Sequence, residues 1–359
     1  MAHALDLARI GVGRVSPGPL VGCVIVDSSG QIVGEGSYVY EGVKHAETLA
    51  LLQAGEKARG GIAYVSLEPH AHHARTAPCT DALIAAGIKR VVAPIQDLNP
   101  SVSGRGFEHL RQARVAVEIG LLAHEAEQLN EKYLHYMRTG WPFVQLKLAV
   151  SLDGKIATRK GDSRWVAGPE SRARAHELRH EFDAILVGAT TAAIDNPLLT
   201  DRSGMQRRRS LVRIVLDDGL RLSSESQLVR TASESPVIVF TGGDVSSERV
   251  SELESQHVEV VKSGSRDLLS VLKELGSRSL QSVLVEGGAS IAGSFADARL
   301  INKATFFVAP KIIGGREAPS AIGGVGVERM ADALELDGIE VLRRGRDVEI
   351  TGYPASLKE

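Results

Sequence analysis

Hydrophobic residues recur in two alternating patterns along the first third of the chain. Helical spacing is found at 2–10, 45–54, 78–86 and 104–113. Short apolar runs that predict strands lie at 21–26, 31–38, 62–67, 88–93 and 115–119. A Ser-Ser-Gly turn at 28–30 joins the first two strands into a hairpin. This alternation predicts a sheet covered by helices, built largely from βαβ units.

The alternation pauses at Gly140 and Pro142 and then resumes. Further strands are predicted at 143–150, 184–187, 211–216, 236–241, 282–285 and 305–308, with helices between them, including 170–181 and 266–275. A length of 359 residues suits two domains of about 150 residues or more each. We therefore predict two α/β domains, 1–142 and 143–359.

Charge and composition narrow the possible partners and locations. Lys plus Arg number 42 against 44 Asp plus Glu, and aromatic residues make up 4%, so the chain lacks the basic and stacking surface that nucleic acids require. Two cysteines cannot build a disulfide framework, which predicts a reducing, cytoplasmic location. Apolar runs stay far below the roughly 20 residues of a membrane span, so no membrane association is expected.

Four residues of the first half have the chemistry of a hydrolytic zinc site: His45, Glu47, His70 and Cys79. Replacing a ring amine by water requires an activated hydroxide and a group that carries protons to the departing ammonia. Zinc held by three protein ligands with an open fourth position supplies the hydroxide. His45, His70 and Cys79 are the predicted ligands, and Glu47, which does not bind the metal, is the predicted catalytic proton carrier.

The spacing agrees in part with the pattern of zinc nucleobase deaminases, His-x-Glu followed by Pro-Cys-x-x-Cys. The first half of that pattern is present, but the last two ligands are further apart here. His45 and Cys79 should each open a helix, where the helix dipole favours a thiolate. Two alternatives remain: a hydrogen-bonded loop without metal, or His72 or His73 as the third ligand.

A glycine-rich turn lies between a strand and a helix in the second half, at 283–294. Backbone N–H groups of such a turn can approach a phosphate closely at the start of a helix. It is not the G-x-G-x-x-G pattern of dinucleotide-binding folds, so a plain tight turn is the alternative.

With these motifs in hand, the chain resembles a known family, the bifunctional riboflavin-biosynthesis deaminase/reductases (RibD). The resemblance covers nearly the whole chain, including the long insert between the last two ligands. The matching segments are SPGPLVGCVIV at 16–26, HAETLAL at 45–51, 67–84, QDLNP at 96–100, KLAVSLDGK at 147–155, 161–165, 179–188 and 191–202.

The resemblance implies a cytidine-deaminase-like three-layer αβα domain followed by a dihydrofolate-reductase-like α/β domain. It also implies two reactions on a small phosphoribosylated pyrimidine: zinc-dependent hydrolytic deamination, with one Zn²⁺ per chain, and NADPH-dependent reduction of the ribosyl group to ribityl. His72, His73 and Arg75 would fall among the substrate contacts of the deaminase. A homo-oligomer, a dimer, is expected by the same likeness.

Residue roles in the reductase follow from the same matching motifs. The residues implied at the NADPH site are Trp165, Thr191, Asp195, Gly288, Ala289, Ser290, Ile291, Ala292, Gly293 and Ser294. Those implied at the substrate are Ser163, Arg179, Leu199, Arg202 and Glu286. The two arginines would bind the substrate phosphate, because guanidinium groups match phosphate geometry.

Two positions depart from the family. His70 stands where Cys is usual, which leaves Cys79 as the one anionic ligand and raises the charge of a zinc site from about zero to about +1. This predicts a pH-rate limb shifted toward acid. Gly18 stands where an Asn usually helps to hold the pyrimidine.

These departures motivate an alternative in which the first half is a zinc-stabilised structural or binding module and only the reductase is active. A deaminase acting on tRNA or DNA is a third alternative, which the composition disfavours.

Overall fold

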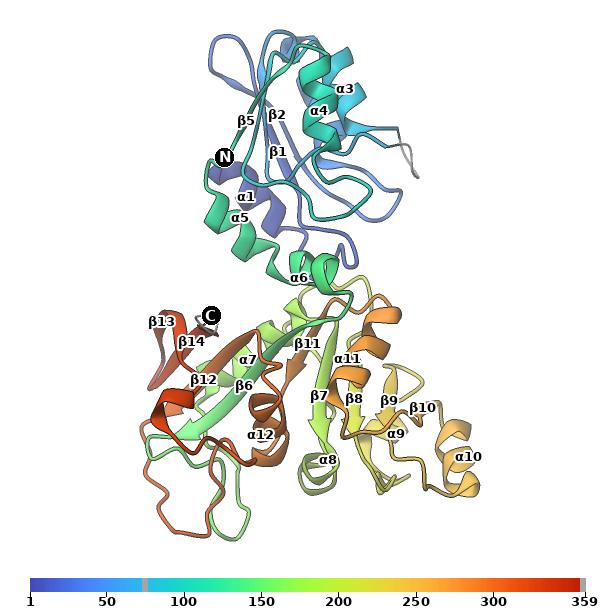
Figure 1. The fold of residues 1–359 in the computed structure, drawn as a ribbon, viewed down its shortest axis with the longest axis vertical. Helices are drawn as coiled ribbons and strands as arrows, with labels where there is room; N and C mark the ends of the chain where they lie inside the picture. Colours follow the sequence, from blue (N-terminus) through green and yellow to red (C-terminus); the bar gives the residue numbers. More distant parts are fainter. Residues whose placement is uncertain (73–76, 356–359) are drawn as a thin grey trace. The chain divides into compact units, whose positions relative to one another are not determined.

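The computed structural model describes residues 1–72 and 77–355, and its chain divides into two compact units (Figure 1). The first unit comprises Met1–Gly140 together with Gln206–Arg209. The second comprises Trp141–Met205 and the chain from Ser210 onward. No helix within 1–72 and 77–355 is both long and apolar enough to span a membrane.

The first unit contains a five-stranded sheet with the order β2-β1-β3-β4-β5. Its strands are β1 (Gly22–Val26), β2 (Ile32–Ser37), β3 (Ile62–Val65), β4 (Arg90–Ala93) and β5 (Ala116–Ile119). β1 runs antiparallel to β2 and β3, whereas β3, β4 and β5 are parallel. The predicted hairpin and the βαβ connections are both confirmed.

Helices cover both faces of this sheet. On one face lie α2 (Ala46–Ala54), α3 (Cys79–Ala85) and α4 (Arg105–Gln112), and on the other α1 (Ala2–Arg9) and α5 (Ala123–Leu129). A 3₁₀ turn, η1 (Gly55–Ala58), follows α2, and α6 (Glu131–Thr139) ends the unit. Separate apolar clusters fill the two sides, one around Ile25 and Leu83, the other around Leu5 and Leu67. The three-layer αβα arrangement agrees with the prediction.

Two glycines of β2 bring α2 unusually close to the sheet. A Cβ atom at Gly34 would lie 2.1 Å from the carbonyl oxygen of Ala50, and one at Gly36 would lie 2.1 Å from that of Ala46. Because neither backbone could give way, only glycine allows this approach. The start of α2, with His45 and Glu47, is thereby fixed against the sheet.

The second unit contains a nine-stranded sheet with the order β10-β9-β8-β7-β11-β6-β12-β14-β13. The strands are β6 (Phe143–Ser151), β7 (Ala184–Gly188), β8 (Val212–Leu216), β9 (Val237–Phe240), β10 (Val258–Val261), β11 (Ser282–Val285), β12 (Lys303–Ala309), β13 (Leu336–Arg344) and β14 (Asp347–Pro354). Strands from β10 to β12 in this order are parallel, and β14 and β13 continue antiparallel.

Alternating side chains of these strands supply cores on both faces of the sheet. Val144, Leu146 and Leu148 of β6 belong to the cluster that includes α11 (Leu268–Ser277) and α12 (Ala289–Asp297). Phe143 packs with α7 (Pro169–Glu181) on the other side. The remaining helices are α8 (Ala189–Asp195), α9 (Gln227–Arg230), α10 (Ser247–Ser255) and η2 (Met330–Asp332). The second half is thus an α/β unit, as predicted.

Candidate metal centre and cofactor cavity

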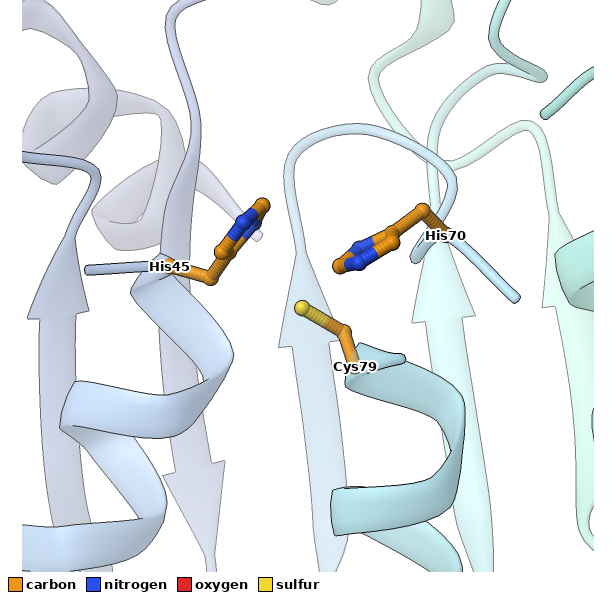
Figure 2. A group of neighbouring side chains, drawn as sticks. All are labelled: His45, His70 and Cys79. Carbon is orange, nitrogen blue, oxygen red and sulfur yellow. The ribbon is translucent and has the colours of Figure 1, made fainter. Parts of the chain in front are cut away.

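His45, His70 and Cys79 converge at one end of the first unit's sheet (Figure 2). One ligand atom from each residue lies within 4.8 Å of the others. The imidazole rings of His45 and His70 are stacked with their centroids 4.5 Å apart. Twenty-four residues lie between His45 and His70 and eight between His70 and Cys79, so their meeting is a property of the fold.

Each of the three side chains is set by a local backbone feature. His45 is the N-cap residue of α2, and Cys79 is the first residue of α3, directly after Pro78. Both predicted helix starts are confirmed. His70 lies in the loop after β3, where its carbonyl oxygen accepts a hydrogen bond from the backbone N–H of Thr80 at 3.3 Å. This bond ties the His70 loop to the start of α3.

Two imidazoles and one thiol are a donor set that suits zinc. Tetrahedral zinc with bonds of about 2.0–2.3 Å holds its donor atoms roughly 3.5 Å apart, so the group needs only small side-chain movements to close around an ion. His72 was the alternative to His70; its ring stands edge-on 5.3 Å from that of His70 and is not part of the converging group. His73 and Arg75 lie outside the described residues.

Glu47 lies beside this group and is almost completely buried. Burial raises the pKa of the Glu47 carboxyl, while its backbone N–H, the neighbouring His45 and a hydrogen bond from the Cys79 thiol act in the opposite direction. A carboxyl group with a raised pKa next to a candidate metal centre is suited to accept and release protons. Its position therefore matches the predicted role of a proton carrier.

The thiol of Cys79 differs from the prediction. The helix start was expected to favour a thiolate, but burial, and next the negative charge of Glu47, raise the pKa of Cys79. In the protein alone, desolvation outweighs the partial charge of the helix end. A bound divalent cation reverses this balance, because a thiol that ligates a metal is deprotonated.

A buried carboxylate anchors the loop that carries His70. Glu68 is 4% exposed and accepts hydrogen bonds from the backbone N–H groups of Asp97, Gly104, Gly106 and Phe107 at 2.9–3.3 Å. A Cβ atom at Gly106 would lie 1.8 Å from the carbonyl oxygen of Pro69, so the two loops are in close contact. The sequence alone does not identify Glu68 as an anchor, because its four partners meet it only in the tertiary structure.

The second unit has a cavity of about 730 Å³ at the carboxyl ends of its parallel strands. Ligands of open parallel sheets bind at this edge. Nine residues named from the sequence line it: Ser163, Thr191, Asp195, Glu286, Gly288, Ala289, Ser290, Ile291 and Ser294. The structure therefore gathers most of the predicted reductase residues around one cavity.

Six other predicted residues do not line the cavity. Ala292 and Gly293 are on the inner side of α12, where Gly293 packs against the backbone of Gly323. Leu199 is 3% exposed within an apolar core cluster. Trp165 is 64% exposed, with the Arg172 guanidinium 4.5 Å from its ring centroid, and Arg202 is exposed. Ala292 and Gly293 do not line the cavity because only one side of the helix α12 faces it.

Arg179, the sixth, reaches the cavity through Glu286. Its Nε and Nη2 atoms donate to the two carboxylate oxygens of Glu286 at 2.8 and 3.0 Å, and Lys147 Nζ donates to the same carboxylate at 3.3 Å. Burial alone would raise the pKa of Glu286, but the charges of Arg179 and Lys147 and their hydrogen bonds lower it to about 2. Glu286 is therefore an ionised, fixed group at the cavity wall.

Several residues that line the cavity were not identified from the sequence. Lys147 belongs to β6 and lines the cavity beside Glu286, and Asp218, Arg221, Ser265 and Arg266 line another part of it. Asp218 accepts hydrogen bonds or an ion pair from Ser265 at 3.1 Å and from Arg266 at 2.7 Å. One signal was available: Asp218 stands two residues after the end of β8, and residues just beyond parallel strands gather at one sheet edge.

The glycine turn ahead of α12 serves both the packing of the helix and the lining of the cavity. A Cβ atom at Gly287 would lie 2.6 Å from Cβ of Ile291, so this position must be glycine for packing. At Gly288 only the Thr191 hydroxyl is near, at 3.3 Å, and both glycines line the cavity ahead of α12. The N-terminus of a nine-residue helix thus faces the cavity, an arrangement that favours an anionic ligand.

Two family models match this chain. Residues 1–94 match the cytidine and deoxycytidylate deaminase zinc-binding region, and residues 142–349 match the RibD C-terminal domain. The first match contains the converging ligand group, and the second contains the cavity.

Complete proteins show the same similarity over both units. The riboflavin biosynthesis protein RibD of Actinobacillus pleuropneumoniae is 42% identical over 340 residues, which cover 94% of this chain and 89% of that protein. Among solved structures, form 1 of Acinetobacter baumannii RibD has a TM-score of 0.88 at 33% identity and covers 99% and 98% of the two chains. The diaminohydroxyphosphoribosylaminopyrimidine deaminase/5-amino-6-(5-phosphoribosylamino)uracil reductase of Thermotoga maritima has a TM-score of 0.87 at 36% identity, covering 99% and 97%.

Proposed function

Because this chain belongs to the RibD family of riboflavin biosynthesis proteins, we propose that it catalyses two consecutive reactions of that pathway. The first is hydrolytic deamination of 2,5-diamino-6-(5-phosphoribosylamino)pyrimidin-4-one. The second is NADPH-dependent reduction of the ribosyl side chain to ribityl. The convergence of His45, His70 and Cys79 beside a buried Glu47 is the observation that carries the first activity.

In the deaminase, His45, His70 and Cys79 would hold a zinc ion, which when bound activates water for attack on the ring carbon that bears the amine. Glu47 holds the proton taken from that water and delivers it to the departing ammonia. Its burial keeps bulk water from competing for the proton.

The number of ligands separates an enzyme from a structural zinc module. Structural zinc sites are closed by four protein ligands, whereas catalytic sites keep one position open. Within the described residues, three donors gather at this centre. Three ligands favour a catalytic zinc site over the alternative in which the first half is only a zinc-stabilised structural or binding module.

In the reductase, the second-unit cavity would hold NADPH and the ribosyl-pyrimidine together. The N-terminus of α12 and the backbone N–H groups of the glycine turn suit the phosphates of the dinucleotide. Glu286, fixed by Arg179 and Lys147, presents a negative charge and hydrogen-bond acceptors to the sugar or the ring. The protein's task is to hold the reduced nicotinamide against the sugar carbon, since hydride transfer is the chemistry of the cofactor.

The division of the two activities at 142/143 stays a prediction, as do the roles of the individual site residues. Both cysteines, Cys23 and Cys79, are free and buried, which supports the proposed cytoplasmic location because thiols remain reduced there.

A two-stage assay tests the proposal. Purified protein is analysed for metal and then given the diaminopyrimidine substrate, first without NADPH and then with it. We expect about one zinc per chain, ammonia release in the first stage, and NADPH oxidation only after deamination. Ammonia release that does not depend on zinc, or NADPH oxidation without ammonia release, would contradict the two-step scheme.

Replacing His70 by cysteine should move the pH dependence of deamination. The variant adds one negative ligand charge, so less positive charge remains to stabilise deprotonated water. We expect the acidic limb of the deaminase pH-rate profile to move to higher pH, with zinc retained. The pH profile of the reductase in the same molecules is the control. An unchanged limb at full zinc content would show that the charge argument fails.

We also propose that the chain forms a homodimer through β13. This strand ends the nine-stranded sheet in the described part of the chain, and it exposes Ile339, Val341 and Leu342 by 48–60%. Such an edge is a ready template for pairing with a second copy. Sedimentation should give twice the mass of one chain, and Val341→Lys should give a single-chain mass. A wild-type protein that sediments as one chain would overturn this proposal.

A further inference from the structure

Tyr38 stands next to the candidate metal centre without having been singled out by any motif. It follows β2 directly, and its backbone N–H donates to the carbonyl oxygen of Val21 at 2.9 Å. Its ring centroid lies 5.5 Å from that of His45, with the two planes inclined by 42°. His45 in turn stacks on His70. The ring of Tyr38 therefore neighbours one of the two candidate imidazole ligands.

The phenol of Tyr38 fills the space beside Gly18. A Cβ atom at Gly18 would lie 2.8 Å from Cε1 of Tyr38 and 3.4 Å from its hydroxyl oxygen. The same atom would lie 3.0 Å from the carbonyl oxygen of Val15, which accepts the N–H of Gly18 at 2.7 Å in a turn. The turn cannot withdraw without losing this bond, so the ring would have to move. The absence of a side chain at Gly18 is therefore a condition for the observed position of Tyr38.

We propose that Tyr38 is a substrate-contacting residue of the deaminase site, and that Gly18 determines its position. This inference rests on the proposed deaminase function. The ligand it concerns is a planar aminopyrimidinone, whose edge carries both N–H donors and a carbonyl acceptor. A phenol matches this edge, because its hydroxyl donates and accepts and its ring offers an aromatic surface. Tyr38 is half-buried, so part of the side chain remains accessible.

A packing role and a substrate role make different predictions for the hydroxyl group. If Tyr38 only filled space, Tyr38→Phe would be nearly silent, because the ring and its volume are retained. If the hydroxyl binds the pyrimidine, the same variant loses one neutral hydrogen bond. We then expect KM for deamination to rise by about 3- to 10-fold with kcat within about twofold. Tyr64→Phe in β3 is the matched control, because it makes the same change at another half-buried tyrosine.

A double-mutant cycle tests the dependence on Gly18. Gly18→Ala adds only the Cβ atom and should displace the phenol, raising KM at least as much as Tyr38→Phe does. In the Gly18→Ala background, Tyr38→Phe should then cost little more, because the hydroxyl no longer reaches the substrate. Zinc content and reductase activity of every variant show whether the chain remains folded and loaded.

Binding can be measured without turnover. In the Glu47→Gln background, calorimetric titration with the pyrimidine should give a Kd that Tyr38→Phe weakens by the same factor as KM. Wild-type ammonia release combined with a silent Tyr38→Phe variant would overturn the role of Tyr38 alone. Additive effects in the cycle would overturn the role of Gly18. A zinc-loaded wild-type protein that releases no ammonia would overturn the deaminase function, and this inference with it.

Discussion

Glu47→Gln is expected to abolish ammonia release while NADPH oxidation by the same chains, assayed with the deaminated pyrimidine, stays intact. Glutamine has the size of glutamate, but it cannot take up a proton. Because general acid-base groups contribute typically 10²- to 10⁴-fold, and Glu47 serves in both the attack and the departure step, we expect a loss of at least about 10³-fold in kcat.

The measurement is ammonia release per zinc-loaded chain, with Glu56→Gln as the control. Glu56 lies in η1, close along the chain, and is exposed. Zinc content should not change, because Glu47 is not one of the three converging ligands. Retention of more than a tenth of the activity would exclude Glu47 as the proton carrier. Loss of zinc would instead identify it as a ligand.

Glu286→Gln should have the opposite selectivity: reduction fails and deamination continues. In the native protein the Glu286 carboxylate balances Arg179 and Lys147 at 11–14% side-chain exposure, and Asp201 adds a further negative charge near Arg179. Removal of the Glu286 charge leaves two cations close together in a poorly hydrated place, and breaking such buried pairs typically costs about 3–5 kcal/mol. We expect kcat/KM of the reductase to fall by at least about 100-fold, which corresponds to roughly 3 kcal/mol.

The pH dependence of this cluster follows from the lowered pKa of Glu286. A carboxyl group whose pKa falls on folding, here from 4.5 to about 2, contributes stability that is complete above its unfolded pKa and is lost as the pH falls toward its folded pKa. Glu286 is therefore ionised throughout the neutral range and should add no limb to the reductase pH profile there. Glu248→Gln on the exposed start of α10 is the control variant. Equal loss of both activities in Glu286→Gln would indicate a global fold defect.

Local sequence patterns predicted most elements; β10, β13 and β14 and the helices α5 and α6 are among the exceptions, and some of these have identifiable causes. No element is predicted between 120 and 139, where the structure forms α5 and α6, whereas the pause predicted at Gly140 coincides with the left-handed residue that ends α6. These two helices are rich in charged residues, so their apolar spacing is weak. β13 was also missed, because an exposed edge strand has no buried side to create an alternating pattern.

The chain by itself determined the chemistry of the candidate metal centre. His45 and Cys79 sit at helix starts, and helix starts are encoded within a few residues by Pro, Gly and the onset of apolar periodicity. The types of ligand, the acid beside them and the α/β alternation could also be recognised from the sequence. This is possible because hydrogen bonding and side-chain alternation within a helix or strand depend on neighbours close in sequence.

Only the tertiary structure decided which residues meet across long distances. It brings His70 rather than His72 into the ligand group, joins Arg179 to Glu286 across 107 residues, and seats the phenol of Tyr38 over Gly18. Such contacts depend on strand order and on the close approach of separate loops. Periodicity along the chain carries no information on either, because both arise from how whole elements pack against one another.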